Sequence, residues 1–170
     1  MDLSEYIRDI PDFPRPGILF KDITPLLAEP RAFHEAVDWL SEICAPLRVD
    51  TIVSIEARGF LFAAPLAYCT GKPLVPVRKK GKLPFDTYSV TYDLEYGTDT
   101  VEVHIDGISN GHRVLIVDDL LATGGTMAAA AQLVERTGGT IAGLAVVLEL
   151  TDLGGRERLK DYNTLSLVKL

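Results

Sequence analysis

Cysteine, tryptophan and long apolar segments are scarce in this sequence of 170 residues. It contains 2 cysteines, 3 histidines and 1 tryptophan, and the cysteines and histidines do not have the ligand spacing of a zinc site. Cys44 and Cys69 each lie in an apolar helical pattern, which predicts buried thiols in a reducing compartment. No apolar run approaches the ~20 residues that a membrane-spanning helix needs. These absences argue against a disulfide scaffold, a zinc domain and a membrane protein.

An excess of basic residues is also missing. The chain has 17 Lys and Arg against 24 Asp and Glu, a formal net charge of −7 and a pI of about 4.9. A broad surface for nucleic acid or for an anionic membrane is therefore not expected. The one basic cluster, Arg78, Lys79, Lys80 and Lys82, is a candidate for a small anionic ligand. The first five residues lack the basic and apolar regions of a signal peptide, so we expect a cytoplasmic protein.

Strand-like and helix-like patterns alternate through most of the chain. Apolar residues at spacings of three and four predict a helix over 30–47, with Pro30 in its first turn. The run 113–117 is continuously apolar, as central parallel strands are. The alternation predicts an α/β fold with a mostly parallel central sheet flanked by helices. The other expected strands span 51–55, 74–77, 141–150 and 165–168, and the other expected helices span 59–68, 126–136 and 153–159.

Residues 87–105 depart from this alternation. Polar and apolar residues alternate on both sides of Gly97, which predicts a β-hairpin inserted between parallel strands. Gly81 and Pro84 precede it in a loop, and insertions on a rigid α/β scaffold often form lids over a site. We therefore expect a single domain, 1–170, with a lid insertion at about 79–106.

The segment 114–126 carries the clearest chemical pattern. An apolar strand ends in two adjacent carboxylates, Asp118 and Asp119, and a turn of small residues then opens a helix. Ligands of parallel sheets bind beyond the carboxyl ends of the strands, where these groups are expected. The turn from Ala122 to Thr126 offers backbone N–H groups and two hydroxyls at a helix N-terminus, which is a cradle for phosphate. Because carboxylates repel phosphate, we interpret Asp118 and Asp119 as acceptors for sugar hydroxyls, one ribose length away.

Two common nucleotide-binding motifs do not fit this segment. A P-loop requires Gly-Lys-Ser/Thr after the turn, and no lysine occurs there. The dinucleotide pattern G-x-G-x-x-G is also absent. The simplest alternative is that the two carboxylates cap a helix and that Gly124-Gly125 makes a turn, but consecutive acids at the end of so apolar a strand fit it poorly.

The same segment resembles a known family. The run Asp-Asp-Leu-Leu-Ala-Thr-Gly-Gly-Thr at 118–126 is similar to the phosphoribosyl-pyrophosphate signature of the type I phosphoribosyltransferases, in the form used by the branch that acts on adenine. The resemblance extends in order over nearly the whole chain. Its other blocks are an N-terminal segment at 13–27, a pyrophosphate loop at 56–62, mobile-loop segments at 78–84 and 94–97, and a C-terminal part at 149–157.

This resemblance implies a fold and a reaction. The expected fold is the type I phosphoribosyltransferase fold, with the hairpin lid and a small N-terminal hood. The expected enzyme is a glycosyltransferase of purine salvage. It would transfer 5-phosphoribosyl from phosphoribosyl pyrophosphate to adenine, giving AMP and pyrophosphate. Neither nucleic acid nor a membrane is expected as a partner.

The resemblance also assigns residues to phosphoribosyl pyrophosphate. Asp118 and Asp119 would bind the ribose hydroxyls, and Arg58 would grip the pyrophosphate and act in catalysis, although an ordinary surface salt bridge is its alternative role. Mg²⁺ would be the cofactor, carried by the pyrophosphate and waters with no protein ligand. The 5-phosphate would be held by Ala122, Thr123, Gly124, Gly125 and Thr126.

The basic run would bind pyrophosphate as well. Arg78, Lys79 and Lys82 are the residues concerned, and in the resembling family the Arg and Lys reach the site of a neighbouring subunit. A homodimer is therefore expected. The alternative is a solvated charged surface.

The remaining assignments concern the base and the lid. Phe20 would stack on the purine, with backbone groups of Leu19 and Lys21 reading its edge and Leu150 closing the other face; a core position is the alternative for Phe20. In the lid, Glu95 would act near the base or the ribosyl cation as general acid or electrostatic stabiliser, with Tyr96 beside it. A solvent-facing pair remains open for these two residues.

Two competing functions fit the residues less well than adenine transfer. Enzymes for 6-oxopurines generally have an Asp where this chain has Ala122, so the methyl group favours adenine. A non-catalytic regulator that binds DNA would need an added DNA-binding module, for which this acidic chain has no residues to spare. The resemblance further predicts a cis peptide bond between Glu56 and Ala57.

Overall fold

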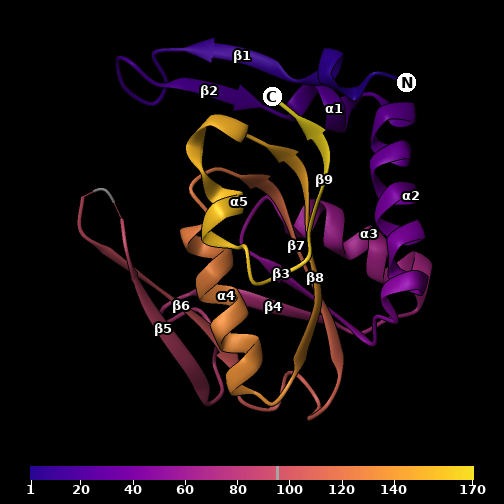
Figure 1. Cartoon of the computed structure of the whole chain (residues 1–170), viewed down its shortest axis with the longest axis vertical. Coiled ribbons are helices and arrows are strands. Elements are labelled where there is room, and N and C mark those ends of the chain that lie inside the picture. The colour runs from indigo at the N-terminus through magenta and orange to yellow at the C-terminus, as the bar shows by residue number, and fades with distance from the viewer. Residues whose placement is uncertain (95) are drawn as a thin grey trace.

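The computed structural model, which describes residues 1–94 and 96–170, contains a seven-stranded sheet with helices on both faces (Figure 1). Five strands of this sheet run parallel, namely β4, β3, β7, β8 and β9. Strands β6 and β5 extend the sheet beyond β4 and pair in antiparallel fashion. In spatial order the strands are β5 (Thr87–Asp93), β6 (Thr98–His104), β4 (Leu74–Lys79), β3 (Thr51–Ile55), β7 (Arg113–Leu121), β8 (Thr140–Glu149) and β9 (Thr164–Lys169). The expected α/β fold is confirmed.

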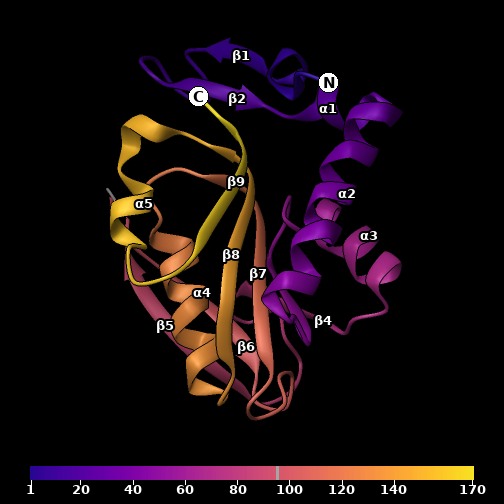
Figure 2. The same cartoon turned by 45° about the vertical axis from the view of Figure 1, so that its right-hand side comes forward.

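The helices divide between the two faces of the sheet. Figures 1 and 2 show α2 and α3 on one face and α4 and α5 on the other. The helical elements are η1 (Leu3–Tyr6), α1 (Thr24–Ala28), α2 (Pro30–Leu47), α3 (Phe60–Thr70), α4 (Gly125–Arg136), η2 (Thr151–Leu153) and α5 (Gly155–Arg158).

The buried core consists of two apolar clusters, one on each face of the sheet. Successive side chains of a strand point to opposite faces, so Leu115 of β7 belongs to the cluster that contains Phe62 of α3, and Ile116 belongs to the cluster that contains Leu133 of α4. All of β3 is buried. Coverage on both faces explains why the central strands are continuously apolar in sequence.

The N-terminal segment forms the expected small hood. Strands β1 (Arg8–Pro11) and β2 (Leu19–Asp22) pair in a separate antiparallel sheet. Figures 1 and 2 both show this hood over the end of the main sheet where β7 and β8 finish. The hood therefore lies above the edge at which a parallel sheet binds its ligands.

Strand β7 continues four residues beyond the predicted 113–117. It pairs with β8 as far as Leu121, whereas its pairing with β3 stops at Val117. The reason is that β8 stays extended to Glu149 and supplies a hydrogen-bonding partner, and turn residues begin only at Ala122. Asp118 and Asp119 consequently lie inside a strand, beyond the last residue of β7 that pairs with β3.

The predicted hairpin is present, and its first strand packs on α4. Strands β5 and β6 pair from Thr87 and His104 to Asp93 and Thr98. Tyr88 and Tyr92 of β5 pack against the α4 cluster, and Arg136 of α4 donates to the Ser89 carbonyl at 2.6 Å. The body of the hairpin is thus attached to the scaffold. Its tip includes Glu95, which lies outside the described residues.

Two local expectations were wrong. Cys44 is buried, but Cys69 is exposed, because the outer face of the apolar helix α3 is not covered. The helix expected at 153–159 is divided into η2 and α5 by Gly154, whose φ of +71° takes the left-handed conformation that ends a helix. In the described part of the chain, no helix is long and apolar enough to cross a membrane.

Candidate active site

A small cavity at the turn between β7 and α4 has the features of a phosphate cradle. Its volume is about 110 Å³, and α4 begins beside it with no side chain capping its N-terminus. The first N–H groups of a helix have no intrahelical acceptor and carry partial positive charge, so they are available to an anion. The lining residues are Asp118 and Leu120 to Met127, which include all five predicted phosphate ligands, Ala122, Thr123, Gly124, Gly125 and Thr126.

Close contact with α5 fixes the shape of this cradle. A Cβ atom on Gly124 would lie 3.0 Å from the carbonyl oxygen of Gly155, and one on Gly155 would collide with the carbonyl oxygen of Ala122. Gly124 also has a φ of +85°, which glycine adopts without steric cost. The start of α5 thus supports the phosphate turn from behind, a role for Gly155 that the sequence did not suggest.

The two carboxylates of β7 differ in their partners. Asp119 is 4% exposed, and its Oδ2 atom lies 2.8 Å from Arg58 Nε. The angle of that contact does not make a hydrogen bond, so Oδ2 has no donor among the described residues. Asp118 Oδ1 accepts a hydrogen bond from the Asp119 N–H at 2.9 Å. Asp119 Oδ2 can therefore accept a hydrogen bond from a ligand hydroxyl.

Burial and the neighbouring acid affect the ionisation of Asp118. Desolvation of the Asp118 carboxyl, together with the negative charge of Asp119, raises the pKa of Asp118 well above its usual range. The hydrogen bond from the Asp119 N–H and the charge of Arg58 oppose this shift without cancelling it. A cation brought to this site by a ligand would relieve the repulsion.

The loop from β3 to α3 brings Arg58 to these carboxylates. Gly59 packs so tightly that a Cβ atom there would lie 2.8 Å from Asp118 Oδ1 and 2.8 Å from the Ile55 carbonyl oxygen. The Glu56–Ala57 peptide bond in this loop is cis, as predicted. Arg58 and Asp118 therefore come from loop and strand segments that are in direct contact.

Glu56, which the sequence did not single out, binds residues of the basic run. Lys82 Nζ lies 2.9 Å and Arg78 Nη2 lies 3.4 Å from Glu56 Oε2, and the Lys79 N–H donates to Oε1 at 2.5 Å. Desolvation would raise the pKa of Glu56, but these partners lower it overall. The Lys79 ammonium pairs instead with Asp99 of β6. The three predicted pyrophosphate ligands are thus held beside the loop that carries Arg58.

The hood contributes Phe20 to the same place. The Arg58 guanidinium lies over the Phe20 ring, 5.4 Å from its centroid, and Phe13 meets Phe20 edge-on at 5.1 Å. Phe20 is half-buried and is in neither core cluster, so the core alternative fails. Arg58 therefore contacts both an aromatic ring and a carboxylate.

The other predicted base-site residues are less closely joined to Arg58. Leu19 is exposed on β2, and the Lys21 ammonium pairs with Asp9 of the hood at 2.6 Å. Leu150 is half-buried at the end of β8 and donates its N–H to the Leu121 carbonyl at 2.9 Å. Near the hairpin tip, the Arg15 guanidinium of the hood lies 5.2 Å from the centroid of the Tyr96 ring. The hood and the hairpin are therefore in contact through these two side chains.

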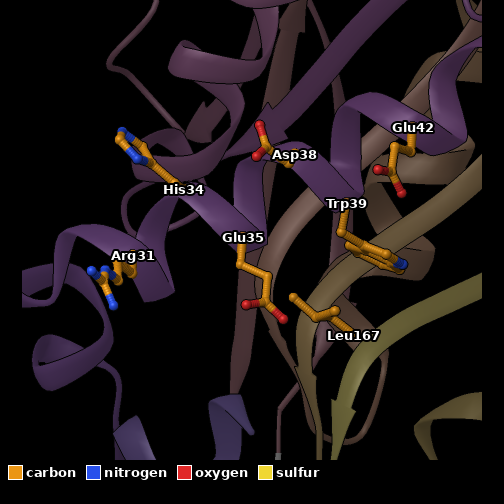
Figure 3. A pocket seen from close by; sticks show the side chains of 7 residues that line it. All are labelled: Arg31, His34, Glu35, Asp38, Trp39, Glu42 and Leu167. Atoms are coloured by element: carbon orange, nitrogen blue, oxygen red, sulfur yellow. The ribbon is translucent and has the colours of Figure 1, made fainter. Parts of the chain in front are cut away.

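A groove elsewhere on the molecule is larger than the cradle but chemically unsuited to a phosphorylated ligand. Its volume is about 520 Å³, and Figure 3 shows Glu35 and Trp39 of α2 pointing toward Leu167 of β9. Three acids, Glu35, Asp38 and Glu42, line it against one arginine, Arg31, and His34, so its charge is unfavourable for phosphate. The cradle at β7 and α4 is therefore the better candidate.

Comparisons with known proteins point to one family. Residues 22–169 match the family model described as the phosphoribosyl transferase domain. The adenine phosphoribosyltransferase of Solibacter usitatus is 57% identical over 99% of this chain and 97% of its own length. The crystal structure of the adenine phosphoribosyltransferase from Thermoanaerobacter pseudethanolicus has a TM-score of 0.96 and 51% identity, covering 99% of this chain and 98% of that one.

A further solved structure contains ligands. The Saccharomyces cerevisiae adenine phosphoribosyltransferase, in complex with adenine and an imino-altritol bisphosphate, has a TM-score of 0.92 and 40% identity. The match covers 98% of this chain and 97% of that chain. The likeness thus extends over the cradle, the loop of Arg58 and the hood together.

Proposed function

This chain belongs to the adenine phosphoribosyltransferases of the type I phosphoribosyltransferase family, and on that premise we propose how its residues divide the reaction. The enzyme transfers the 5-phosphoribosyl group of phosphoribosyl pyrophosphate to adenine, giving AMP and pyrophosphate, which is a step of purine salvage. The roles of individual residues, the metal, the oligomeric state and the compartment are parts of the proposal.

The 5-phosphate and the ribose occupy the end of β7. The uncapped N-terminus of α4 supports binding of the 5-phosphate by Ala122 to Thr126. Asp119 Oδ2, which lacks a hydrogen-bond donor among the described residues, accepts from a ribose hydroxyl, and Asp118 binds the other. One observation carries the proposal: a phosphate turn without a side-chain cap lies next to a carboxylate oxygen that has no hydrogen-bond donor among the described residues, at the end of one strand.

Arg58 and the basic run bind the pyrophosphate. Arg58 gives up part of its contact with Asp119, and Arg78, Lys79 and Lys82 exchange Glu56 and Asp99 for pyrophosphate oxygens. Each exchange replaces one anion by another, so no cation is left without a partner. The pairs with Glu56 and Asp99 keep these side chains ordered before the substrate arrives.

Adenine lies between the hood and the end of β8. Phe20 stacks on one face of the base, Leu150 contacts the other, and backbone groups of Leu19 and Lys21 read the edge. The cation–π contact of Arg58 with Phe20 supports this arrangement, because it orients the ring next to the pyrophosphate ligand.

The chemical step places positive charge on the ribose as pyrophosphate leaves. Arg58 stabilises the departing pyrophosphate, the base nitrogen attacks from the opposite face of the ring, and the configuration at the anomeric carbon inverts. Glu95 and Tyr96 of the hairpin tip act beside the base or the ribosyl cation. Closing the tip against the hood excludes water that would hydrolyse the substrate, and the Arg15–Tyr96 contact supports such closure.

Mg²⁺ is the proposed cofactor, and the pyrophosphate and waters would hold it. The donor set fits this arrangement, because in the described part of the chain no group of three or more His, Cys, Asp or Glu side chains could hold a metal ion by itself. When bound, Mg²⁺ neutralises the pyrophosphate leaving group. Asp118 and Asp119 contribute negative charge near it but remain hydrogen-bond acceptors for the ribose.

The active form is a cytoplasmic homodimer of a single-domain chain, 1–170. Helix α3 is apolar around its whole circumference, yet Leu61 and Tyr68 are 45% and 89% exposed. A helix of this composition is normally buried, so its outer face supports a subunit contact. The hairpin at about 79–106 then extends from β4, the strand that carries Arg78.

A panel of bases tests the proposed specificity. Adenine offers an exocyclic amino donor where hypoxanthine and guanine present a carbonyl oxygen. A site that reads the amino group leaves polar groups unpaired with a 6-oxopurine, at a cost of ~1–3 kcal/mol each. With Mg²⁺ and phosphoribosyl pyrophosphate, we expect kcat/KM for adenine to exceed that for hypoxanthine or guanine by at least ~100-fold. Equal values for adenine and hypoxanthine would refute adenine specificity.

A further inference from the structure

A chain of polar contacts crosses the base of the hairpin and ends in the phosphate cradle. The Tyr92 hydroxyl of β5 lies 3.0 Å from Thr126 Oγ1 at the start of α4 and 3.4 Å from Asp99 Oδ2 of β6. Asp99 in turn pairs with the Lys79 ammonium of β4. The chain thus joins a proposed ligand of the 5-phosphate to a proposed ligand of the pyrophosphate.

The Tyr92 ring packs directly on the cradle. A Cβ atom on Gly125 would lie 3.6 Å from Tyr92 Cδ2, an ordinary van der Waals distance, so the ring lies directly beside the start of α4. Tyr92 also lines a cavity of about 530 Å³ together with Thr123, Gly125 and Thr126, three residues that the cradle shares. The hydroxyl of Tyr92 is therefore next to the phosphate site, whereas the sequence suggested only an apolar position in a hairpin.

The number of protons in this chain decides what Tyr92 does. A hydroxyl group has one proton to donate, so Tyr92 donates either to Asp99 or to Thr126. If Tyr92 donates to Asp99, Thr126 donates to Tyr92 and turns its proton away from the cradle. A phosphate dianion only accepts hydrogen bonds, so it requires the Thr126 proton to point at the ligand.

We propose that Tyr92 is a positioning residue for the 5-phosphate, which donates its hydroxyl proton to Thr126 Oγ1 and thereby directs the Thr126 proton into the cradle. The proposal rests on the proposed role of Thr126 as a phosphate ligand. Hydrogen bonds in such a chain polarise one another, so the Thr126 hydroxyl becomes a better donor. Asp99 competes for the Tyr92 proton when the cradle is empty and keeps the hydroxyl in reach.

A double-mutant cycle tests this role. Tyr92→Phe removes only the hydroxyl, and Thr126→Val removes the group on which it acts. Binding of ribose 5-phosphate and, separately, of inorganic pyrophosphate is measured by calorimetry on the full-length protein. We expect Tyr92→Phe to weaken ribose 5-phosphate binding by about fivefold and to leave pyrophosphate binding within about twofold. The double variant should bind ribose 5-phosphate like Thr126→Val alone.

Two further variants separate proton direction from simple packing. Tyr88→Phe removes a hydroxyl from the same face of β5, four residues away, and should change neither affinity. Asp99→Asn replaces the competing carboxylate by a neutral amide, which is a weaker acceptor, and keeps Tyr92 and Thr126, so it should bind ribose 5-phosphate at least as tightly as the wild type. This variant also decides the matter if Tyr92→Phe does not fold.

The proposal is overturned if Tyr92→Phe binds ribose 5-phosphate like the wild type. It is also overturned if the losses of ribose 5-phosphate affinity in Tyr92→Phe and Thr126→Val multiply in the double variant. A third contradicting result is an Asp99→Asn protein that binds ribose 5-phosphate about fivefold more weakly than the wild type. In the last case the network merely holds the hairpin in place. A wild-type protein that fails to bind ribose 5-phosphate contradicts the cradle itself. Wild-type binding with an unaffected Tyr92→Phe contradicts only the role of Tyr92.

Discussion

Two adjacent acids and one arginine set the electrostatics at the end of β7. The pKa of Asp118 is raised, first by desolvation and then by the charge of Asp119. When the pKa of an acid is higher in the folded than in the unfolded state, the protein loses stability as the pH rises above the pKa that the acid has in the unfolded state. At neutral pH the Asp118 carboxyl group therefore costs stability, and the protein retains it for a purpose other than folding.

Replacing Asp118 should accordingly stabilise the fold and lower the catalytic activity. Asp118→Asn keeps the oxygen that accepts from the Asp119 N–H but removes the like charge. We expect a gain of about 1 kcal/mol at pH 7, or ~2–4 °C in Tm, with at least a ~10-fold loss in kcat/KM for phosphoribosyl pyrophosphate. Thermal unfolding from pH 3.5 to 8 should show the two proteins converging at the acid end, where Asp118 is protonated.

The outcome for Asp119 provides the comparison. Asp119→Asn removes the ion-pair partner of Arg58, so it should lose activity without the same gain in Tm. Wild-type activity in a folded Asp118→Asn or Asp119→Asn protein would remove that residue from the site. A lower Tm for Asp118→Asn at pH 7 would contradict the sign of the pKa shift.

At the scale of elements, the ion pair between Arg156 and Glu149 holds α5 against the ends of β8 and β9. Glu149 of β8 accepts from Arg156 Nε at 2.9 Å and Nη2 at 2.5 Å, and from the Ser166 hydroxyl at 2.5 Å. Arg156 also donates to the Thr164 carbonyl. The hydrogen bonds from Arg156 lower the pKa of Glu149 to about 2. Because α5 supports the phosphate turn through Gly155, this pair also supports the site.

The lowered pKa of Glu149 makes the stability of the folded protein depend on pH in the acidic range. The contribution of Glu149 is complete above its unfolded value near 4.5 and disappears as pH falls toward about 2. Glu149→Gln should therefore lower the free energy of unfolding by roughly 2–3 kcal/mol at pH 7, with the difference shrinking below pH 4. Urea unfolding at pH 7, 4.5 and 3 measures it. Glu157→Gln, on α5 but 80% exposed, is the matched control with no expected effect.

Element bounds that a local sequence pattern marks were predictable, and bounds that depend on a distant partner were not. The predicted ranges of α2 and β3 agree with the structure to the residue, because each is a periodic or continuous apolar run with polar residues at its ends. The last four residues of β7 were missed, because its pairing with β8 depends on a segment far along the chain. The break at Gly154 was missed because glycine alone does not say which of two short helices it ends.

The site shows the same division. Asp118, Asp119 and Ala122 to Thr126 are consecutive, so their joint position follows from one strand and one turn. Glu56, Tyr92 and Gly155 act on residues distant in sequence, and no local pattern marks such partners. Contacts of this kind depend on tertiary packing, which sequence periodicity does not encode.

At the scale of the whole molecule, one apolar surface has no cover within the described part of the chain. Leu61 and Tyr68 of α3 are exposed together with Leu74 at the start of β4, the strand that ends near Arg78. Within its own subunit, Arg78 Nη2 is 3.4 Å from Glu56, and its Nε atom is buried without a hydrogen-bond partner among the described residues. A second subunit packed on α3 would bury the apolar surface and offer this arginine further partners.

Placing a charge on that surface tests whether it is the subunit contact. Tyr68→Asp puts a carboxylate on the apolar face of α3, where a second subunit would desolvate it. The variant should therefore sediment as a monomer at concentrations at which we expect the wild type to sediment as a dimer. Glu157→Lys changes the charge of a side chain that is 80% exposed on α5 and should leave the dimer intact. A dimeric Tyr68→Asp protein would place the contact elsewhere.

Mixing two inactive variants tests whether Arg78 acts across the subunit contact. Arg78→Ala removes the arginine, and a double variant with Asp118→Asn and Asp119→Asn keeps the arginine but disables its own site. A mixed dimer has one site with intact acids and an arginine from the partner. After subunit exchange at equal amounts, about half of the dimers are mixed, so activity should recover to roughly a quarter of the wild-type value. Energy transfer between labelled subunits monitors the exchange. If exchange occurs and activity stays at the level of the separate variants, Arg78 serves its own subunit.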